Sequence, residues 1–152
     1  SIYSLWLARD ELTEGFYLID SDIFFTAELL RQLIQAPYEN CIIVDNTKPY
    51  SNIDMKVRLA DSKLTTMSKM LPEYETHGEF FGMSKYSQEG GMVFLSEVDK
   101  LVRQGKTDIW YEMALIEAAQ KANIYAIYTN NLFWLEIDST TDLEKARSLL
   151  GD

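Results

Sequence analysis

Segments with helical periodicity alternate along this chain with short apolar segments of strand length, and this order limits the possible folds more than any other feature. Helices are expected where apolar residues recur at helical spacing, over residues 1–12, 26–35, 88–104, 107–122 and 139–150. Strands are expected over residues 16–20, 40–45, 54–60, 63–69, 78–84, 124–129 and 133–137. The alternation predicts an α/β fold with a Rossmann-like sheet, mixed but mostly parallel, that is flanked by helices.

Size and composition predict a single domain over residues 1–152, because a chain of this length can bury a core without disulfides. The formal net charge of -10 would repel phosphate backbones, so nucleic acid is not an expected partner. No apolar stretch approaches the roughly 20 residues of a membrane helix, and no signal-type segment is recognisable. We therefore expect no membrane partner and a cytoplasmic location. Cys41, the single cysteine, is expected to be a buried strand thiol.

Two pairs of acidic residues stand where predicted strands end. Asp20 and Asp22 follow "FYLI", and Glu136 and Asp138 leave the strand of "FWLEI". Ligands of open α/β sheets bind beyond the carboxyl ends of strands, so both pairs are expected at one crevice. Magnesium prefers one or two carboxylates and takes its other ligands from water and substrate phosphates. The pattern is typical of a Mg²⁺ site for phosphoryl transfer, and it is equally typical of turns that follow strands.

Two other polar groups favour structural roles. Ser139 and Asp142 match the capping box that begins a helix. His77 is the only histidine, which excludes histidine-cluster zinc sites, and it suits a solvated or capping role better than catalysis.

Aromatic and basic residues suggest substrate contacts, with a structural alternative for each. Trp110, Tyr111 and Glu112 are adjacent and suit a cage for a cationic head group, or the start of a helix that packs in the core. Lys56 and Lys69 lie on predicted strands, where a lysine can reach a phosphate as a point charge or simply face the solvent.

Seven stretches, taken in order, carry a family resemblance: "SLWLARDEL", "FYLIDSDIFF", "CIIVD", "DMKV", "SKMLP", "GEFFGMSKYS" and "WLEIDSTTDLEKA". They run over nearly the whole chain, and "IDSD" and "WLEIDS" are the most specific of them. Together they resemble the later part of the small cytidylyltransferases, enzymes similar to phosphocholine and 2-aminoethylphosphonate cytidylyltransferases within the sugar-nucleotidyltransferase superfamily.

The resemblance implies that Asp22 and Asp138 bind a catalytic Mg²⁺, with Asp20 and Glu136 flanking the site. It implies a reaction in which a phosphate or phosphonate oxygen of a small substrate attacks the α-phosphate of CTP, and pyrophosphate leaves. Such a nucleophile is already anionic near neutral pH, so in-line positioning and charge neutralisation suffice without a general base. This agrees with a chain that contains one histidine.

The resemblance also directs the expectations about the acceptor substrate. Glu112, Trp110 and Tyr111, with Trp134 on the last predicted strand, would receive a trimethylammonium or a primary ammonium group. This favours phosphocholine or aminoethylphosphonate over a sugar 1-phosphate, which would prefer polar hydrogen-bonding residues.

One element of the family is absent from the printed residues. Its members begin with a strand and a glycine-rich loop of the type G-x-G-x-R, which holds the nucleotide triphosphate, followed by Pro-Leu-Thr and a Pro-Lys element. The chain therefore resembles the C-terminal portion of a nucleotidyltransferase catalytic domain, without its N-terminal nucleotide loop. We expect it to bind CTP poorly, to turn over little when alone, and to self-associate through an exposed sheet edge and apolar surface.

Two other functional classes remain open. "FYLIDSD" also resembles the first motif of haloacid-dehalogenase-type phosphatases, in which Asp20 would be a nucleophile and Asp22 an acid/base, with Asp138 and Asp142 holding magnesium. Against this, Phe24 stands where that family has Thr or Val. The third possibility is a non-catalytic binding or scaffold protein that keeps the fold and the acids.

Overall fold

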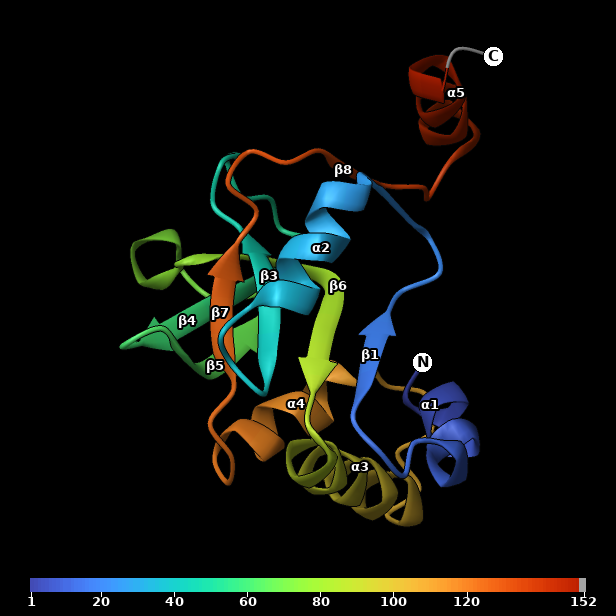
Figure 1. The fold of residues 1–152 in the computed structure, drawn as a ribbon, viewed down its shortest axis with the longest axis vertical. Helices are drawn as coiled ribbons and strands as arrows, with labels where there is room; N and C mark the ends of the chain where they lie inside the picture. Colours follow the sequence, from blue (N-terminus) through green and yellow to red (C-terminus); the bar gives the residue numbers. More distant parts are fainter. Residues whose placement is uncertain (151–152) are drawn as a thin grey trace.

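The structure, a computed structural model, describes residues 1–150. Its helices are α1 (Ile2–Ala8), α2 (Ala27–Gln35), α3 (Gln88–Arg103), α4 (Glu112–Ala119) and α5 (Thr140–Leu150), with short 3₁₀ turns η1 (Arg9–Glu11) and η2 (Glu73–Glu75). Its strands are β1 (Phe16–Ile19), β2 (Ile23–Phe25), β3 (Cys41–Asp45), β4 (Met55–Ala60), β5 (Lys63–Ser68), β6 (Gly78–Tyr86), β7 (Tyr125–Tyr128) and β8 (Trp134–Glu136). Figure 1 shows their arrangement.

Six of the strands form one curled sheet in the order β1-β6-β3-β7-β5-β4, and β4 also pairs with β6. The strands β6, β3, β7, β5 and β4 therefore close a ring of pairings, and β1 lies outside this ring on β6. The predicted mixed α/β sheet with flanking helices is confirmed. The expectation of mostly parallel strands is wrong, because within residues 1–150 only the β3–β7 pairing is parallel.

A short connection accounts for one of the antiparallel pairs. β4 and β5 are joined by a hairpin whose two turn residues, Asp61 and Ser62, both have positive φ, 49° and 64°. Such a turn matches the twist of an antiparallel pair, whereas parallel neighbours need a crossover of a dozen or more residues.

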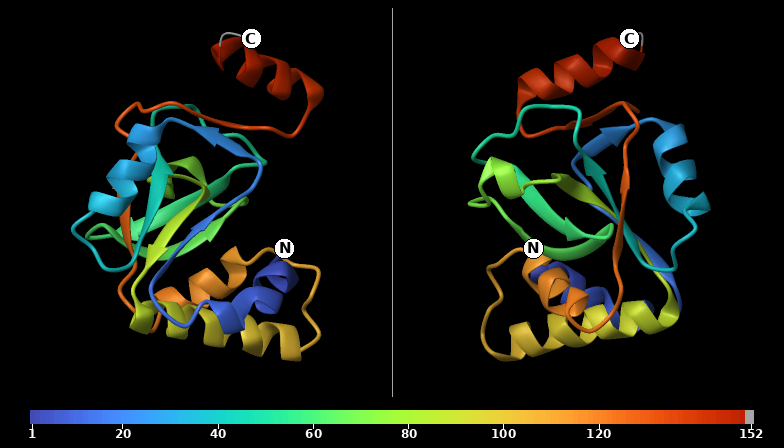
Figure 2. Two further views of the ribbon diagram at one scale, coloured as in Figure 1. Left: turned by 45° about the vertical axis from the view of Figure 1, so that its right-hand side comes forward. Right: turned by 90° about the vertical axis from the view of Figure 1, so that its left-hand side faces the viewer.

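The sheet separates two hydrophobic cores. Figure 2 shows helix α2 apart from the group formed by α1, α3 and α4. On β3, Ile42 and Val44 face the core under α1, α3 and α4, while Cys41 and Ile43 face the core under α2. All five residues of β3 are buried, which is why its apolar run does not alternate with polar residues. Cys41 is the buried thiol that the sequence predicts.

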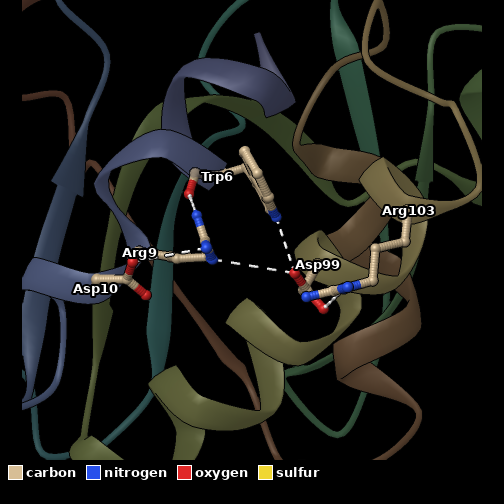
Figure 3. A network of polar contacts seen from close by, with 5 residues as sticks. All are labelled: Trp6, Arg9, Asp10, Asp99 and Arg103. Atoms are coloured by element: carbon tan, nitrogen blue, oxygen red, sulfur yellow. Dashed lines mark hydrogen bonds and ion pairs between the residues drawn. The ribbon is translucent and has the colours of Figure 1, made fainter.

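A polar network holds the short helix α1 against α3 (Figure 3). The indole N–H of Trp6 donates to Asp99 Oδ1 over 2.9 Å, and Arg103 Nε donates to Asp99 Oδ2 over 2.5 Å. Arg9 lies over the Trp6 ring at 4.0 Å and donates to the Trp6 carbonyl oxygen. A helix of seven residues is not stable by itself in water, so these tertiary contacts stabilise it.

Helix α5 extends away from the rest of the fold beyond β8 (Figures 1 and 2). It begins with the predicted capping box: Ser139 N and Oγ donate to Asp142 Oδ2, and Asp142 N donates back to Ser139 Oγ. Ala146 is its one buried residue, while Leu143, Leu149 and Leu150 are exposed. None of the helices within residues 1–150 combines the length and apolar character that crossing a bilayer requires.

Helix α3 is also tied to the turn after α4 by a buried carboxylate, which generates a stability prediction. The Glu97 side chain is only 2% exposed and forms ion pairs with Lys100, over 3.2 Å, and with Lys121. Replacing Glu97 by Gln should lower the free energy of unfolding by about 1 to 2 kcal/mol, because the negative charge and one of the two acceptor oxygens are lost.

Urea denaturation of the variant measures this loss. Glu89→Gln, an exposed acid of the same helix, is the matched control and should change stability by less than about 0.5 kcal/mol. Equal stabilities of the two variants would contradict the role given to Glu97.

Candidate functional site

A cavity of about 330 Å³ opens where β1, β6 and the segment after β8 approach the start of α4. Seven acidic residues line it, and Lys69 is the basic side chain among the residues that do so. The acids are Asp20, Asp22, Asp54, Glu79, Glu112, Glu136 and Asp138. We call this cavity the acidic cleft. Like charges so close together repel one another, and a bound cation relieves this repulsion. The cleft therefore favours cations.

The two acidic strand ends meet in space. Carboxylate oxygens of Asp22, Glu136 and Asp138 all lie within 4.8 Å of one another, and all three residues are exposed. The pairing of β2 with β8 causes this, since Ile23 lies opposite Glu136 and the Ile137 N–H donates to the Asp22 carbonyl over 2.8 Å. Three exposed carboxylates leave room for water and substrate oxygens, as a hard divalent cation such as Mg²⁺ requires.

Strand β2 is the element that sequence reasoning missed, because three apolar residues are too few to show a period. The sequence placed Asp20 and Asp22 together at the end of one strand. In the structure they lie between β1 and β2, and only Asp22 joins the carboxylate cluster.

Asp20 lies at a break in the sheet. Along one edge of β6, β4 pairs with residues 78–80 and β1 with residues 83–86. Between them Gly82 has φ 94°, and the Asp20 N–H donates to the Gly82 carbonyl over 2.9 Å. Burial raises the pKa of the Asp20 carboxyl to about 6, against a hydrogen bond from Tyr111 that lowers it and the nearby Asp22 charge that raises it.

The three adjacent residues of the expected cage take different positions. Glu112 lines the cleft at the start of α4, and burial raises its pKa to about 7, with Asp20 adding to the shift. Trp110 is 53% exposed, and the Lys69 ammonium lies 4.1 Å from the centre of its ring. Tyr111 is buried, its ring packs edge-on against Phe94, and its hydroxyl donates to Asp20. Trp110 is therefore the exposed member of this group, while Glu112 and Lys69 are half-buried at the cleft.

Lys56 and Trp134 are not among the residues that line the cleft, and this corrects their expected substrate contacts. Lys56 is buried on β4, opposite Glu79 in the β4–β6 register. The Trp134 ring stacks on Phe81 at 4.0 Å, its N–H donates to Asp45 over 2.7 Å, and Lys48 covers it at 3.7 Å. Both faces of the indole are therefore occupied by the protein itself. Sequence periodicity could not show this, because strand residues on either face are buried here.

Asp54 and Glu79 line the cleft and were missed as site residues. Glu79 lies within the motif "GEFFG", and Asp54 precedes β4 in "DMKV". Burial raises the pKa of Glu79 to about 7, and the negative charge of Asp54 adds to the shift. An acid flanked by apolar strand residues was the signal that could have found Glu79, since such a position buries a charge.

Two residues considered for other chemistries have structural roles. Asp142 caps α5 and does not line the cleft, so the pair of magnesium ligands that a haloacid-dehalogenase-type phosphatase needs is not assembled. His77 Nδ1 accepts a hydrogen bond from the Leu59 N–H over 3.3 Å, which ties the segment before β6 to the β4–β5 hairpin. This agrees with the non-catalytic role expected of the histidine.

No protein-family model matches the chain. It is 25% identical over 151 residues, 97% of its length, to the bifunctional IPC transferase and DIPP synthase of Aquifex aeolicus (strain VF5), of which it spans 32%. The CTP:phosphocholine cytidylyltransferase from Streptococcus pneumoniae superposes with a TM-score of 0.75 at 20% identity, covering 98% of this chain and 63% of that one. The inositol-1-phosphate CTP transferase from T. maritima gives a TM-score of 0.73 at 19% identity, covering 98% and 60%.

These likenesses show that the chain has the fold of the nucleotidyltransferases, which confirms the resemblance seen in the sequence at the level of the fold. The chain spans about a third of the curated relative that it matches, 32% of its length. Activity, donor, acceptor and metal are therefore matters of proposal.

Proposed function

We propose that this chain takes part in Mg²⁺-dependent nucleotidyl transfer, with CTP as the donor and a small phosphate or phosphonate as the acceptor. The observation that carries the proposal is the convergence of Asp22, Glu136 and Asp138 in the acidic cleft. The fold supports it, since solved structures that share it include proteins named as a phosphocholine cytidylyltransferase and an inositol-1-phosphate CTP transferase.

The residues of the cleft suit this chemistry. Asp22 and Asp138, assisted by Glu136, would hold the metal ion, which when bound neutralises charge on the phosphates. Lys69, the basic residue of the cleft, would attract the acceptor phosphate as a point charge. The acceptor oxygen forms a bond to the α-phosphorus of CTP, and the bond to the pyrophosphate oxygen breaks. The attacking oxygen is already ionised near neutral pH, so the absence of histidine from the residues that line the cleft is no obstacle.

For the head group of the acceptor we propose a cation. Asp20, Glu112 and Trp110 all line the cleft, and Trp110 remains 53% exposed although Lys69 lies over its ring. Their charges and the indole ring would attract a trimethylammonium or a primary ammonium, as in phosphocholine or aminoethylphosphonate.

We further propose that this chain by itself turns over little substrate without an additional nucleotide-binding segment. A G-x-G-x-R loop, which would hold the triphosphate through backbone N–H groups, does not occur in the printed sequence. The acidic cleft by itself would repel a triphosphate, because one lysine stands against seven acids. The alternative is a non-catalytic scaffold with the same fold, and the first experiment below distinguishes it from nucleotidyl transfer.

Pyrophosphate release from CTP is the first prediction. With Mg²⁺ and phosphocholine or aminoethylphosphonate, the chain alone should release little, and the chain joined to a segment that carries a G-x-G-x-R nucleotide loop should release pyrophosphate. Asp22→Asn or Asp138→Asn should lower the rate by about 100-fold or more, because the charge that holds the metal ion is lost.

Asp61→Asn is the matched control, since Asp61 lies in the hairpin turn with φ 49°, a conformation that asparagine tolerates. Its rate should equal that of the unmodified protein. No release from either form of the protein would reject nucleotidyl transfer. Release of phosphate instead of pyrophosphate, with trapping of fluoroberyllate at Asp20, would favour the phosphatase.

The head-group proposal predicts a pH-dependent preference. Glu112 has a pKa of about 7, so its carboxyl is neutral below this pH and attracts a cation only as the pH rises through 7. The ratio of affinities for phosphocholine and inositol 1-phosphate should therefore rise with pH, since both ligands carry the same titrating phosphate. Glu112→Gln should lower the ratio by roughly tenfold at pH 8 and flatten its pH profile, leaving the part that comes from Asp20.

Isothermal titration calorimetry measures both affinities. Glu117→Gln, an exposed acid of the same helix, is the control and should leave the ratio unchanged. Equal losses of affinity for the two ligands in Glu112→Gln would contradict the head-group proposal.

Self-association of the chain is also proposed, and the free edge of β1 supports it. Within residues 1–150, β1 pairs on one side only, with β6. Sedimentation velocity at rising concentration should show assembly, which Tyr17→Lys on β1 should weaken because a charged edge resists strand pairing. Tyr74→Lys, exposed in η2, is the control. A single monomeric species at high concentration would contradict the proposal.

A further inference from the structure

We propose that Tyr111 is a positioning residue: with Gly82 it fixes the Asp20 carboxylate and so determines where Asp22 enters the carboxylate cluster. The inference rests on the proposed metal site, and it concerns a residue that lines the cleft and whose hydroxyl contacts Asp20, which is not one of the three carboxylates of the cluster. Asp20, Gly82 and Tyr111 come from three separate parts of the chain, namely the end of β1, the middle of β6 and the segment before α4.

Tyr111 brings a rigid hydroxyl from the core to the edge of the cleft. The residue is 7% exposed, and its ring packs edge-on against Phe94 of α3 with 6.3 Å between ring centres. Its hydroxyl donates to Asp20 Oδ1 over 3.1 Å. Because the ring is held by the core, this hydrogen bond fixes one carboxylate oxygen of Asp20 with little freedom.

Gly82 supplies the second constraint on the same carboxylate. A Cβ atom placed on Gly82 would lie 2.2 Å from Asp20 Oδ2, so the carboxylate occupies the space that a side chain would need. The Asp20 N–H donates to the Gly82 carbonyl over 2.9 Å. The φ of 94° at Gly82 also excludes most other residues. Asp20 is thus held through its backbone N–H, through Oδ1 and by close packing at Oδ2.

The position of Asp20 bears on Asp22 because one residue, Ser21, separates them. On the other side, the Asp22 carbonyl accepts a hydrogen bond from the Ile137 N–H over 2.8 Å, next to Glu136 and Asp138 of the cluster. The short segment from Asp20 to Asp22 is therefore anchored at both ends. Removing the Tyr111 hydrogen bond takes away one of the three constraints on Asp20 and so loosens the segment that carries the Asp22 carboxylate, which a metal ion requires in a fixed geometry.

The chain contains a matched control for the Tyr111 hydroxyl. Tyr86 is 2% exposed and stacks on the same Phe94, with 4.8 Å between ring centres. Its hydroxyl is buried and has no hydrogen-bond partner within residues 1–150. Tyr86→Phe and Tyr111→Phe thus remove the same atom from the same core, and only the second removes a contact with Asp20.

The test is Mn²⁺ binding to the whole chain, measured by electron paramagnetic resonance in the absence of nucleotide and acceptor. Tyr111→Phe should weaken Mn²⁺ binding by about 10-fold, the order found when a residue that orients a metal ligand is removed. Tyr86→Phe should bind Mn²⁺ as the unmodified chain does, and Asp22→Asn should lose binding. Thermal unfolding should show a cooperative transition for both phenylalanine variants, because the rings that pack in the core remain and the proteins are folded.

A double-mutant cycle distinguishes positioning from a general effect on stability. If Tyr111 acts through Asp20, then Tyr111→Phe should have no further effect on Mn²⁺ affinity in an Asp20→Ala background. Fully additive losses, equal losses in Tyr111→Phe and Tyr86→Phe, or unchanged affinity in Tyr111→Phe would each overturn the inference while the metal site stands. Absence of Mn²⁺ binding by the unmodified chain would instead overturn the metal site, and the inference with it.

Discussion

Strand β6 pairs with three other strands, and the arrangement of the rest of the molecule depends on these pairings. One edge of β6 is covered along its length by β3, while the other edge is shared between β4 and β1. The edge can be shared because the ladder is interrupted at Gly82, where a positive φ redirects the strand. That interruption places the end of β1, and with it Asp20, at the acidic cleft. The β2–β8 ladder then brings the acids of residues 136–138 to the same place.

Burial of acidic side chains, with repulsion between them, is the second constraint on the cleft. Burial raises the pKa of Asp20 to about 6 and those of Glu79 and Glu112 to about 7, and it raises the pKa of Glu136 as well. Folding therefore gathers carboxyl groups that resist ionisation near neutral pH, and a cation would relieve this cost. A divalent ion at one end and a cationic head group at the other would divide the charge between two ligands of the proposed reaction. This division explains why so few basic residues suffice in the cleft.

Strong local signals made much of the fold predictable. The helices α2, α3 and α5 and the strands β3 to β7 follow from period, capping and turn residues, and the box of Ser139 and Asp142 forms as expected. The direction of the strands was not predictable from the same signals, because a short apolar run reads alike in parallel and antiparallel sheets. The helix expected over residues 107–122 is shorter, Glu112–Ala119, since the segment before it is used to bring Tyr111 to Asp20.

For the candidate site, the amino-acid sequence by itself determined the kind of chemistry: carboxylates at strand ends, a near absence of histidine, and an excess of acidic residues that favours cations. Only the tertiary structure decided which carboxylates share a site. It brought Asp22 to Glu136 and Asp138, added Asp54 and Glu79 to the cleft, and buried Lys56 and Trp134 outside the set of residues that line it. The physical reason is that residue types and their periods are local properties. The meeting of side chains more than 100 residues apart depends on strand pairing and on the single glycine at which one ladder ends.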